Sequence, residues 1–184
     1  MAIFSLHTER LDLKVLDESY SELVLQYLSK NRNFHKPFVP ERADYFYTDT
    51  FQSNHLKHNQ RLFHLKRSIR FHLFRKHQPK QIIGDLAFDN IILGSFLSCY
   101  LGYQMDEEEV NQGYMTEGLK KGIEFIFESV GLHRIEANIM PSNERSARVV
   151  KKLGFTNEGS AKDYLKINGK WEDHNHWVLL NDRV

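Results

Sequence analysis

The pattern of apolar and polar positions divides the first third of the chain into one strand and two helices. Residues 8–16 alternate in part between apolar and charged side chains, which predicts a strand. Residues 17–31 carry apolar side chains at helical spacing behind a capping residue, so we expect a helix there. Residues 35–47 hold two prolines among many aromatic side chains and are expected to form an ordered loop, with a second helix over 48–65.

The middle of the chain is dominated by strand patterns. Residues 70–75 alternate between apolar and basic side chains, and 78–80 indicate a turn. Residues 81–92 are expected to form the next strand, in which Gly84 marks a bulge or a close backbone approach. The long apolar and aromatic segment 96–105 is typical of a central strand.

The last third alternates helices and strands. Helices are expected over 115–130 and 143–153, each followed by a glycine that stops it. A strand is expected over 134–140, and 155–181 should hold two strands around the turn Asn168-Gly169. The resulting order, β-α-α-β-β-β-α-β-α-β-β, combines antiparallel pairs with helical crossovers. We therefore expect an α+β fold with a mixed, mostly antiparallel sheet.

Composition narrows the class of protein. The chain has 184 residues, of which 41% are hydrophobic and 27% charged, and this predicts a single domain over 1–184. Its one cysteine, Cys99, cannot form an internal disulfide and is expected to pack as a small apolar residue. No stretch has the length of a membrane span, and the N-terminus does not resemble a signal peptide. The expected location is the cytoplasm.

The net charge is only +1, so nothing draws the whole molecule to nucleic acid. The charge is uneven, however, because no acidic residue occurs between Thr50 and Gly84. This basic block is either a solvated surface or a site for phosphates or an acidic partner. The acidic run 106–109 is expected in solvent. The basic block contains Lys57, Arg61, Lys66, Arg67, Arg70, Arg75, Lys76 and Lys80.

Two segments carry candidate chemistry. In 101–119 a strand leads through a turn with Gly113 into a helix, and such a turn aims free helix N-terminal N–H groups at one point. That geometry suits a phosphate or pyrophosphate, although a plain connection has the same pattern. In 134–155 a strand leads into a helix that Ser142 or Asn143 can cap. Asn143 is either a simple cap or a ligand-binding amide.

Together these segments resemble the GNAT acetyltransferase superfamily, and within it the RimJ/RimL-type N-terminal acetyltransferases of ribosomal proteins. The resemblance runs from Thr8-Glu9-Arg10-Leu11 to Trp177 and rests on six motifs in order. They are Gly102-Tyr103, the segment from Asn111 to Leu119, His133-Arg134-Ile135-Glu136-Ala137, Pro141-Ser142-Asn143-Glu144-Arg145-Ser146, Lys152-Leu153-Gly154-Phe155 and the segment from Asn168 to His174.

The resemblance implies a GNAT fold whose central strands splay apart, with helices on both faces, and acetyl-CoA as cosubstrate without a metal. It assigns backbone groups of 103–105 to the pantetheine arm and helix amides to the pyrophosphate. Two positions depart from the family's pyrophosphate pattern: Val110 replaces Arg or Gln, and Met115 replaces a small residue. The implied cofactor-binding residues are Tyr103, Gln104, Met105, Gln112, Gly113, Tyr114, Met115, Thr116 and Asn143.

The implied reaction is direct attack of a neutral amine on the thioester, without a covalent enzyme intermediate. Glu136 is either the general base or a structural carboxylate paired with Arg134 or Lys152. Ser146 either stabilises the departing thiolate or merely packs, and Tyr164 is a weaker candidate for the same role. The family's usual tyrosine acid is absent, because Val150 stands at its position.

Two smaller expectations concern residues near these motifs. The amide near Met105 is placed to stabilise the oxyanion. Glu117, in the first turn of its helix, is expected to have a structural role. His174 and His176 share a strand face beside Asp173, but we expect no metal there.

The expected function is acetyl transfer from acetyl-CoA to a primary amine, most simply the N-terminal α-amine of a ribosomal protein with an alanine or serine first residue. The alternatives are acetylation of a small amine, such as a polyamine, amino acid or drug, and a non-catalytic CoA-binding module. The basic block favours an acidic acceptor. The chain is expected to be a monomer or homodimer with no membrane or nucleic-acid partner.

Overall fold

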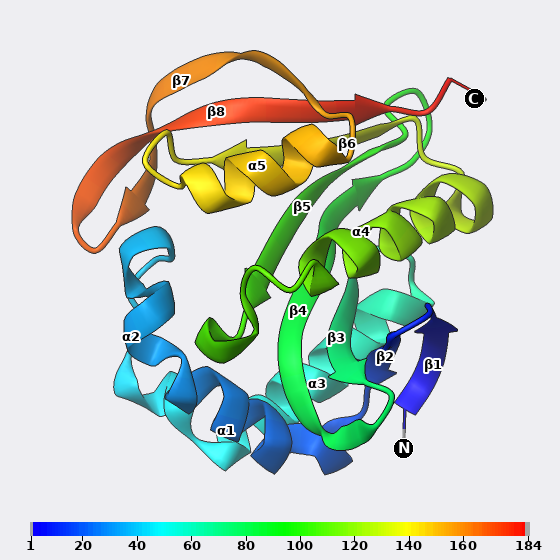
Figure 1. The fold of residues 1–184 in the computed structure, drawn as a ribbon, viewed down its shortest axis with the longest axis vertical. Helices are drawn as coiled ribbons and strands as arrows, with labels where there is room; N and C mark the ends of the chain where they lie inside the picture. Colours follow the sequence, from blue (N-terminus) through cyan, green and yellow to red (C-terminus); the bar gives the residue numbers. More distant parts are fainter. Residues whose placement is uncertain (1, 183–184) are drawn as a thin grey trace.

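The computed structural model describes residues 2–182. All strands of this part of the chain form one sheet in the order β1-β2-β3-β4-β5-β6-β8-β7 (Figure 1). Neighbouring strands are antiparallel except β5 and β6, which are parallel. The α+β class with a mixed sheet is thereby confirmed. The strands are β1 (Ala2–His7), β2 (Leu11–Leu16), β3 (Ile69–Arg75), β4 (Gln78–Ile92), β5 (Ser98–Met105), β6 (Arg134–Ile139), β7 (Thr156–Ile167) and β8 (Lys170–Leu180).

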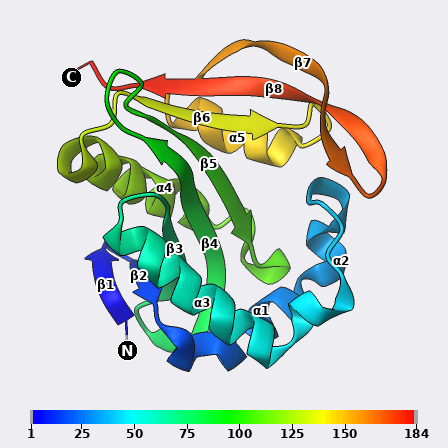
Figure 2. The same cartoon turned by 180° about the vertical axis from the view of Figure 1, so that it is seen from behind.

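Helices cover both faces of the sheet (Figures 1 and 2). Helices α4 and α5 lie on one face, whereas α1 and α3 lie on the other. A π-helical turn at Ile126–Val130 continues α4 to Gly131, whose positive φ of 80° ends the helix as the sequence predicts. The helices are α1 (Ser21–Lys30), α2 (Arg32–His35), α3 (Asp49–His64), α4 (Tyr114–Phe125) and α5 (Glu144–Lys152).

Three local predictions are wrong. The strand Ala2–His7 was not expected, because its residues are only half-buried on the sheet edge and lack clean alternation. The turn before β4 lies at Lys76-His77, so Gln78–Lys80 already belongs to the strand. The expected loop 35–47 contains 3-10 turns at Lys36–Phe38 and Asp44–Tyr47, and α2 ends at its first residue.

Two hydrophobic clusters hold the helices to the sheet. The larger cluster joins α4 and α5 to the sheet through side chains such as Leu86, Leu119 and Ile135. It includes Cys99, which is 3% exposed, as expected for a small apolar residue. The smaller cluster joins α1 and α3 to β2, β3 and β4 and has six buried members in the described chain. These six are Leu16, Val24, Tyr27, Leu56, Phe74 and Ile82.

The sheet opens between its two parallel strands. β5 and β6 pair only from Ser98↔Arg134 to Tyr100↔Glu136, and beyond that point the strands diverge (Figure 1). On the other side of β5, Gly84 of β4 lies so close that an added Cβ would stand 2.8 Å from the Gln104 carbonyl oxygen. The ladder of β4 with β3 also shifts register beside Gly84. The expected close approach is confirmed, and the last five residues of β5 face the opening.

Candidate active site

A cavity of about 700 Å³ occupies the opening between β5 and β6. Its volume lies in the range of ligand sites in proteins. On one side of the sheet it is lined by residues at the start of α4 and along α5, and on the other side by residues of α1, α3, β3 and β4. The gap in the ladder thus joins two half-sites, one on each face of the sheet.

The first half-site contains the N-terminus of α4. Gly113 precedes the helix with a φ of 79°, and Asn111 also has a positive φ, of 64°. Within the described chain, no protein group accepts a hydrogen bond from the N–H groups of Tyr114, Met115 and Thr116. Free first-turn amides and the helix dipole together form an anion site.

Arg10 and Thr8 hold this helix start in place. The Glu117 carboxylate accepts hydrogen bonds from Thr8 Oγ1 at 2.6 Å, from the Arg10 N–H at 2.9 Å and from Arg10 Nε at 2.7 Å. Although partial burial opposes it, these hydrogen bonds lower the pKa of Glu117. Arg10 also donates to the Gln112 carbonyl oxygen at 3.0 Å and lies over the Tyr114 ring. The expected structural role of Glu117 is confirmed.

The start of α5 forms the opposite wall. The Asn143 side chain caps the helix by accepting a hydrogen bond from the Ser146 N–H at 3.2 Å. The Tyr103 hydroxyl donates to the Ser146 carbonyl oxygen at 2.8 Å, which ties β5 to α5 across the opening. Burial raises the pKa of Tyr103, so this hydroxyl keeps its proton. Within the described chain the Ser146 hydroxyl has no hydrogen-bond partner, and the residue lines the cavity.

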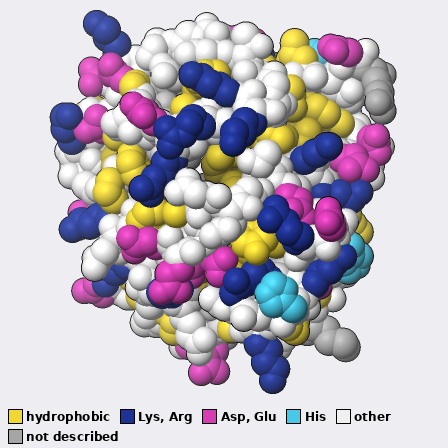
Figure 3. All heavy atoms as spheres, viewed as in Figure 1, with side chains coloured by type: hydrophobic (Ala, Val, Ile, Leu, Met, Phe, Trp, Pro, Cys, Tyr) yellow, Lys and Arg dark blue, Asp and Glu magenta, His cyan; other side chains and the backbone are white. Residues whose placement is uncertain are grey.

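Basic side chains surround this half-site. Arg145, Arg148 and Lys152 of α5 line the cavity, and Lys and Arg side chains gather over α5 on the surface (Figure 3). Their positive charge lies on the same side of the sheet as the free amides of α4. A ligand with several phosphates fits this combination.

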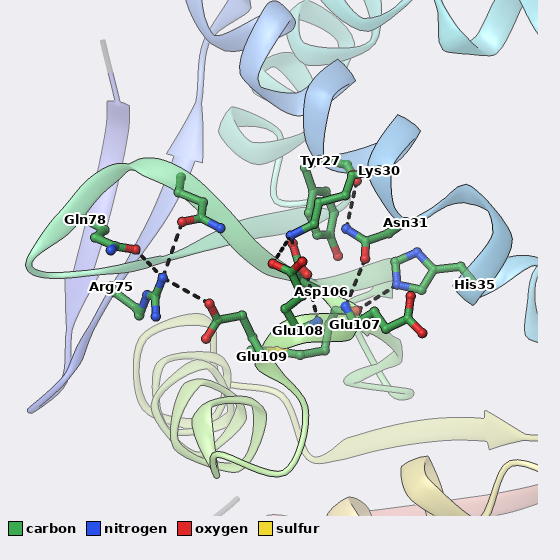
Figure 4. A network of polar contacts seen from close by, with 12 residues as sticks. Tyr27, Lys30, Asn31, His35, Arg75, Gln78, Asp106, Glu107, Glu108 and Glu109 are labelled. Atoms are coloured by element: carbon green, nitrogen blue, oxygen red, sulfur yellow. Dashed lines mark hydrogen bonds and ion pairs between the residues drawn. The ribbon is translucent and has the colours of Figure 1, made fainter.

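The acidic run is only half in solvent, contrary to the expectation: Glu107 and Glu108 are exposed, but Asp106 and Glu109 are buried. Asp106 is 1% exposed and accepts a hydrogen bond from Lys30 Nζ at 2.9 Å, and Glu109 is 8% exposed and pairs with Arg75 at 3.0 Å (Figure 4). Despite the opposing effect of burial, hydrogen bonds from Lys30, Asn31 and the Glu108 N–H lower the pKa of Asp106. The run therefore fixes the loop between β5 and α4.

Residues of α1 and α2 hold the same loop from the other face of the sheet. Asn31 accepts a hydrogen bond from the Glu107 N–H at 2.9 Å, and Nε2 of His35 lies 2.8 Å from the Met105 carbonyl oxygen (Figure 4). The last carbonyl of β5 is thereby engaged by a side chain from the second half-site. No motif of the sequence indicates this contact, because α2 joins the site only through tertiary packing.

The second half-site is polar. Asp85 of β4 is 5% exposed and accepts a hydrogen bond from Arg70 Nη1 at 2.6 Å and one from the Tyr27 hydroxyl at 3.3 Å. His72, also 5% exposed, and Gln52, fully buried, line the same space. Burial is the main cause that lowers the pKa of His72 to about 4, so this ring is neutral at pH 7.

The basic block does not surround an acceptor. Of its eight side chains only Arg70 lines the cavity, and Arg70 is paired with Asp85 and Asp89. Arg75 is paired with Glu109. The preference for an acidic acceptor, which the basic block suggested, therefore has no support in the geometry.

Glu136 lies at the closed end of the opening, in the last pair of the β5–β6 ladder. Its two carboxylate oxygens contact Arg134 Nη2 at 2.9 Å and His176 Nδ1 at 2.8 Å. These partners outweigh partial burial and lower the pKa of Glu136. The side chain does not line the cavity. These contacts match the structural alternative, with Arg134 as the partner, rather than the role of base.

Some of the remaining predicted site residues line the cavity and others do not. Gln112 does not line it, because its side chain is exposed and its carbonyl oxygen accepts from Arg10. The Tyr164 hydroxyl lies 3.1 Å from Asn138 Nδ2 and is likewise outside the lining. The cavity brings together Tyr103, Gln104, Met105, Gly113, Tyr114, Met115, Thr116, Asn143 and Ser146.

Comparison with known proteins places this geometry in a family. Residues 10–156 match the model of the GNAT acetyltransferase domain. The chain belongs to the GNAT acetyltransferases. It is an N-acetyltransferase with the GNAT fold, and the predicted resemblance to RimJ/RimL-type enzymes is confirmed.

Three relatives are informative. The chain is 36% identical over 170 residues to the ribosomal protein uS5-alanine N-acetyltransferase of Escherichia coli K12, covering 92% of this chain and 87% of that protein. The structure of the ribosomal-protein-S5-alanine acetyltransferase from Vibrio fischeri superimposes with a TM-score of 0.93 at 32% identity, covering 97% of each chain. RimJ of Mycobacterium smegmatis, solved in complex with a CoA disulfide, shares the fold with a TM-score of 0.87 at 22% identity, covering 95% of this chain and 83% of that one.

Proposed function

We propose that this GNAT enzyme transfers the acetyl group of acetyl-CoA to the N-terminal α-amine of a protein, and that the acceptor is a ribosomal protein. The observation that carries the proposal is the cavity that passes through the gap between β5 and β6 and opens into a half-site on each face of the sheet. Similarity to enzymes named for uS5 N-terminal acetylation supports the choice of acceptor. Such an acceptor implies a cytoplasmic enzyme, and in residues 2–182 no helix is long and apolar enough to cross a membrane.

The residues of the first half-site fit acetyl-CoA. The free amides at the start of α4 suit its pyrophosphate, and Arg145, Arg148 and Lys152 supply positive charge for its phosphates. The unpaired edge of β5 from 101 to 105 offers backbone groups to the amides of the pantetheine arm. When bound, acetyl-CoA supplies an activated acyl group.

The chain supplies hydrogen bonds around the acyl group. We assign the Met105 N–H to the thioester oxygen, on which negative charge develops during attack, because the next N–H, of Asp106, already donates to the Ile83 carbonyl oxygen at 2.9 Å. His35 holds the adjoining carbonyl and so fixes the orientation of this peptide segment. We assign the free Ser146 hydroxyl to the departing thiolate, because a hydrogen bond stabilises the sulfur anion.

The acceptor amine must lose a proton. Three carboxylates lie on the acceptor face of the sheet near the opening: Glu136, outside the cavity, and Asp85 and Asp89, within its lining. We place the proton transfer at Asp85 through water in the cavity, because Asp85 lies beside Gln104 in the β4–β5 ladder.

Thiol release from acetyl-CoA tests the proposed function. The purified enzyme is given peptides that begin with the N-terminal residues alanine or serine, the same peptides with blocked α-amines, and small amines such as spermidine. We expect turnover only with the peptides that have free α-amines. Turnover restricted to small amines, or absence of turnover with every acceptor, would contradict the proposal.

A matched pair of variants ties this turnover to the α4 site. Gly113→Asp adds a negative charge at the start of α4, with its Cβ 3.4 Å from Arg10 Nη2, whereas Gly113→Asn has nearly the same shape without the charge, and both residues tolerate the positive φ of 79°. We expect acetyl-CoA affinity, measured by calorimetry, to fall at least 100-fold for the aspartate variant and less than tenfold for the asparagine variant. Equal affinity of both would exclude the pyrophosphate from this position.

A further inference from the structure

Most of the basic block lies outside the cavity, and part of it gathers on one surface. On the exposed side of α3, Lys57, Arg61 and His64 follow one another at a spacing of three or four residues, so they lie in one line. Figure 2 shows this helix on the outside of the molecule, on the sheet face opposite α4 and α5. We use the name α3 basic surface for the exposed residues Lys57, Arg61, His64, Lys66 and Arg67.

The end of α3 keeps the last two of these residues beside its final turn. The Lys66 N–H donates to the Phe63 carbonyl oxygen at 3.0 Å, and the Arg67 N–H donates to the Leu62 carbonyl oxygen at 2.9 Å. This pair of bonds is a Schellman motif, in which the residue with positive φ is usually glycine. Here that residue is Lys66, with a φ of 52°. A cation therefore occupies a position where the backbone conformation favours glycine.

The cations of this surface are largely unpaired. Within the described chain, no acidic side chain forms an ion pair with Arg61, Lys66 or Arg67. Lys57 Nζ lies 4.0 Å from the carboxylate of Glu18, but both side chains are about half exposed, and such a pair contributes little. The helix dipole favours a cation in the last turn, but it does not require a lysine with positive φ. The positive charge is thus available to a partner.

The surface is also hollowed. A shallow depression of about 410 Å³ is lined by Lys57, Gln60, Arg61, His64 and Leu65. From Lys57 to His64 the helix rises by about 10 Å. One strand of a nucleic-acid duplex carries a phosphate about every 3 Å along its axis, so about three phosphates would face this length. A line of basic side chains with no acid between them fits such a row.

The net charge of +1 does not oppose a local site. At physiological ionic strength, interactions between exposed charges are screened over about 8 Å. A phosphate on the α3 basic surface therefore responds to the adjacent cations and hardly to acidic residues on other faces. Our expectation that nucleic acid is not a partner used the charge of the whole chain, whereas the structure gathers the cations on one side of one helix.

The chemistry of the surface favours nucleic acid over an acidic protein. Phosphates recur at a fixed spacing along a strand, as the basic side chains do along α3, whereas carboxylates on a protein surface have no regular spacing. The proposed acceptor favours the same choice, because a ribosomal protein in its particle is surrounded by RNA.

We propose that the α3 basic surface binds the phosphate backbone of double-helical RNA and so docks the enzyme on the RNA around its ribosomal-protein acceptor. The choice of RNA rests on the proposed function, but the binding itself needs neither acetyl-CoA nor an amine. The inner side of α3 lines the acceptor half-site through Gln52 and Leu56, whereas its outer side contacts the RNA. One helix thereby connects docking with the position of the acceptor.

The first test measures binding of the purified enzyme to a short, fluorescently labelled RNA duplex of arbitrary sequence. The logarithm of the association constant should fall with the logarithm of the salt concentration at a slope of about −3, since each neutralised phosphate contributes about 0.9. Poly-glutamate should displace the RNA far less effectively than unlabelled duplex does. Absence of binding at low salt would refute the proposal, and equal displacement by poly-glutamate would replace RNA with an acidic protein.

Three variants connect the binding to this surface. Lys66→Gly removes a cation and gives the Schellman position its usual residue, so the melting temperature should be equal or higher while RNA affinity falls about fivefold. Arg61→Gln should weaken binding by about the same factor, and each of the two variants should reduce the salt slope by about one. Lys120→Gln removes an exposed cation of α4 on the opposite face and should change neither quantity.

The comparison among these variants decides the matter. Equal losses of affinity in all three variants would mean that overall charge, and not the α3 basic surface, attracts RNA. Full affinity in both Lys66→Gly and Arg61→Gln would also overturn the proposal. Because neither residue lines the cavity, both variants should acetylate free peptides at the rate of the unmodified enzyme.

Failure of the inference can be told from failure of the proposed function, because RNA binding is measured without acetyl-CoA or acceptor. If free peptides are acetylated and RNA is not bound, the inference falls alone. If RNA is bound through this surface and only small amines are acetylated, the proposed function falls and the RNA site remains.

Discussion

The two faces of strands β3 to β5 differ in how completely they are filled. Toward α4, a Cβ added at Gly122 would lie 3.1 Å from atoms of both Leu86 and Phe88, so helix and sheet are in close contact. Toward α3, the space above Gly102 is open, and buried polar atoms remain without partners. The same strands thus supply a tightly packed face and a hollow one.

The difference follows from the alternation of side chains along a strand. In β4, Leu86 and Phe88 point toward α4, whereas Asp85 and Ala87 point toward α1 and α3. One set of alternate residues stabilises the fold by burial of apolar surface, and the other set shapes a binding site. Stability and specificity can therefore be altered separately by substitutions one residue apart.

The largest expected effect comes from placing the same substitution, glycine to valine, on each of the two faces of the sheet. Gly122→Val forces branched carbons against Leu86 and Phe88, and we expect it to lower the free energy of unfolding by about 3 kcal/mol. Gly102→Val enters open space, so stability should change by less than about 0.5 kcal/mol while acceptor turnover falls. Urea denaturation and thiol release measure the two effects. Equal loss of stability in both variants would mean that the α3 face is packed as well.

A second prediction uses the histidines of the α3 face. Burial is the main cause that lowers the pKa of His55 and of His72 to about 4, against 6.5 for an ordinary histidine. Above pH 6.5 both the folded and unfolded chains carry neutral rings; between 6.5 and 4 only the unfolded chain binds the protons. The free energy of unfolding should therefore fall as the pH falls through this range, by about 2 kcal/mol for the buried His72 alone by about pH 5.

Urea denaturation at a series of pH values checks this dependence. His72→Gln should reduce the slope, because the variant has no proton to gain at that position. His77→Gln removes an exposed histidine of the β3–β4 turn and should leave the slope as it is. An equal slope in all three proteins would show that the α3 face does not bury a neutral ring.

The smallest expected effect concerns Glu136, at the end of the polar face. Glu136→Gln weakens the contacts with Arg134 and His176, and we expect a loss of about 1 kcal/mol in stability. Its kcat should stay within about threefold, because the side chain lies outside the cavity. A loss of 100-fold in kcat with full stability would instead establish the role of base that the sequence allowed.

Much of the fold could be predicted because most of its helices and strands have their own local sequence signals. The helix expected over 48–65 is α3, at Asp49–His64 behind the Thr48 cap. β1 was missed because a half-buried edge strand has no strong alternation. The turn at Lys76-His77 was placed two residues late because Pro79, usually a turn signal, occurs here in the first part of β4.

The site was predictable where one continuous segment forms it. Gly113 and the α4 amides lie within a single motif, as do Asn143 and Ser146. The acceptor face is assembled from α1, α2, α3, β3 and β4, so no spacing in the chain reveals that Gln52 and His72 line the same cavity. The role of Glu136 was left open for a related reason. Strand parity gives the face on which it lies, but the partner that engages it, His176, comes from another strand.

The short ladder between β5 and β6 has a mechanical consequence. Three residue pairs of β5 and β6 join the two halves of the sheet. Beyond them, the coenzyme arm can bind between the diverging strands in the place of an additional strand. A ligand bound across this junction holds the two halves of the sheet together. The free energy of unfolding should therefore increase when the coenzyme is bound.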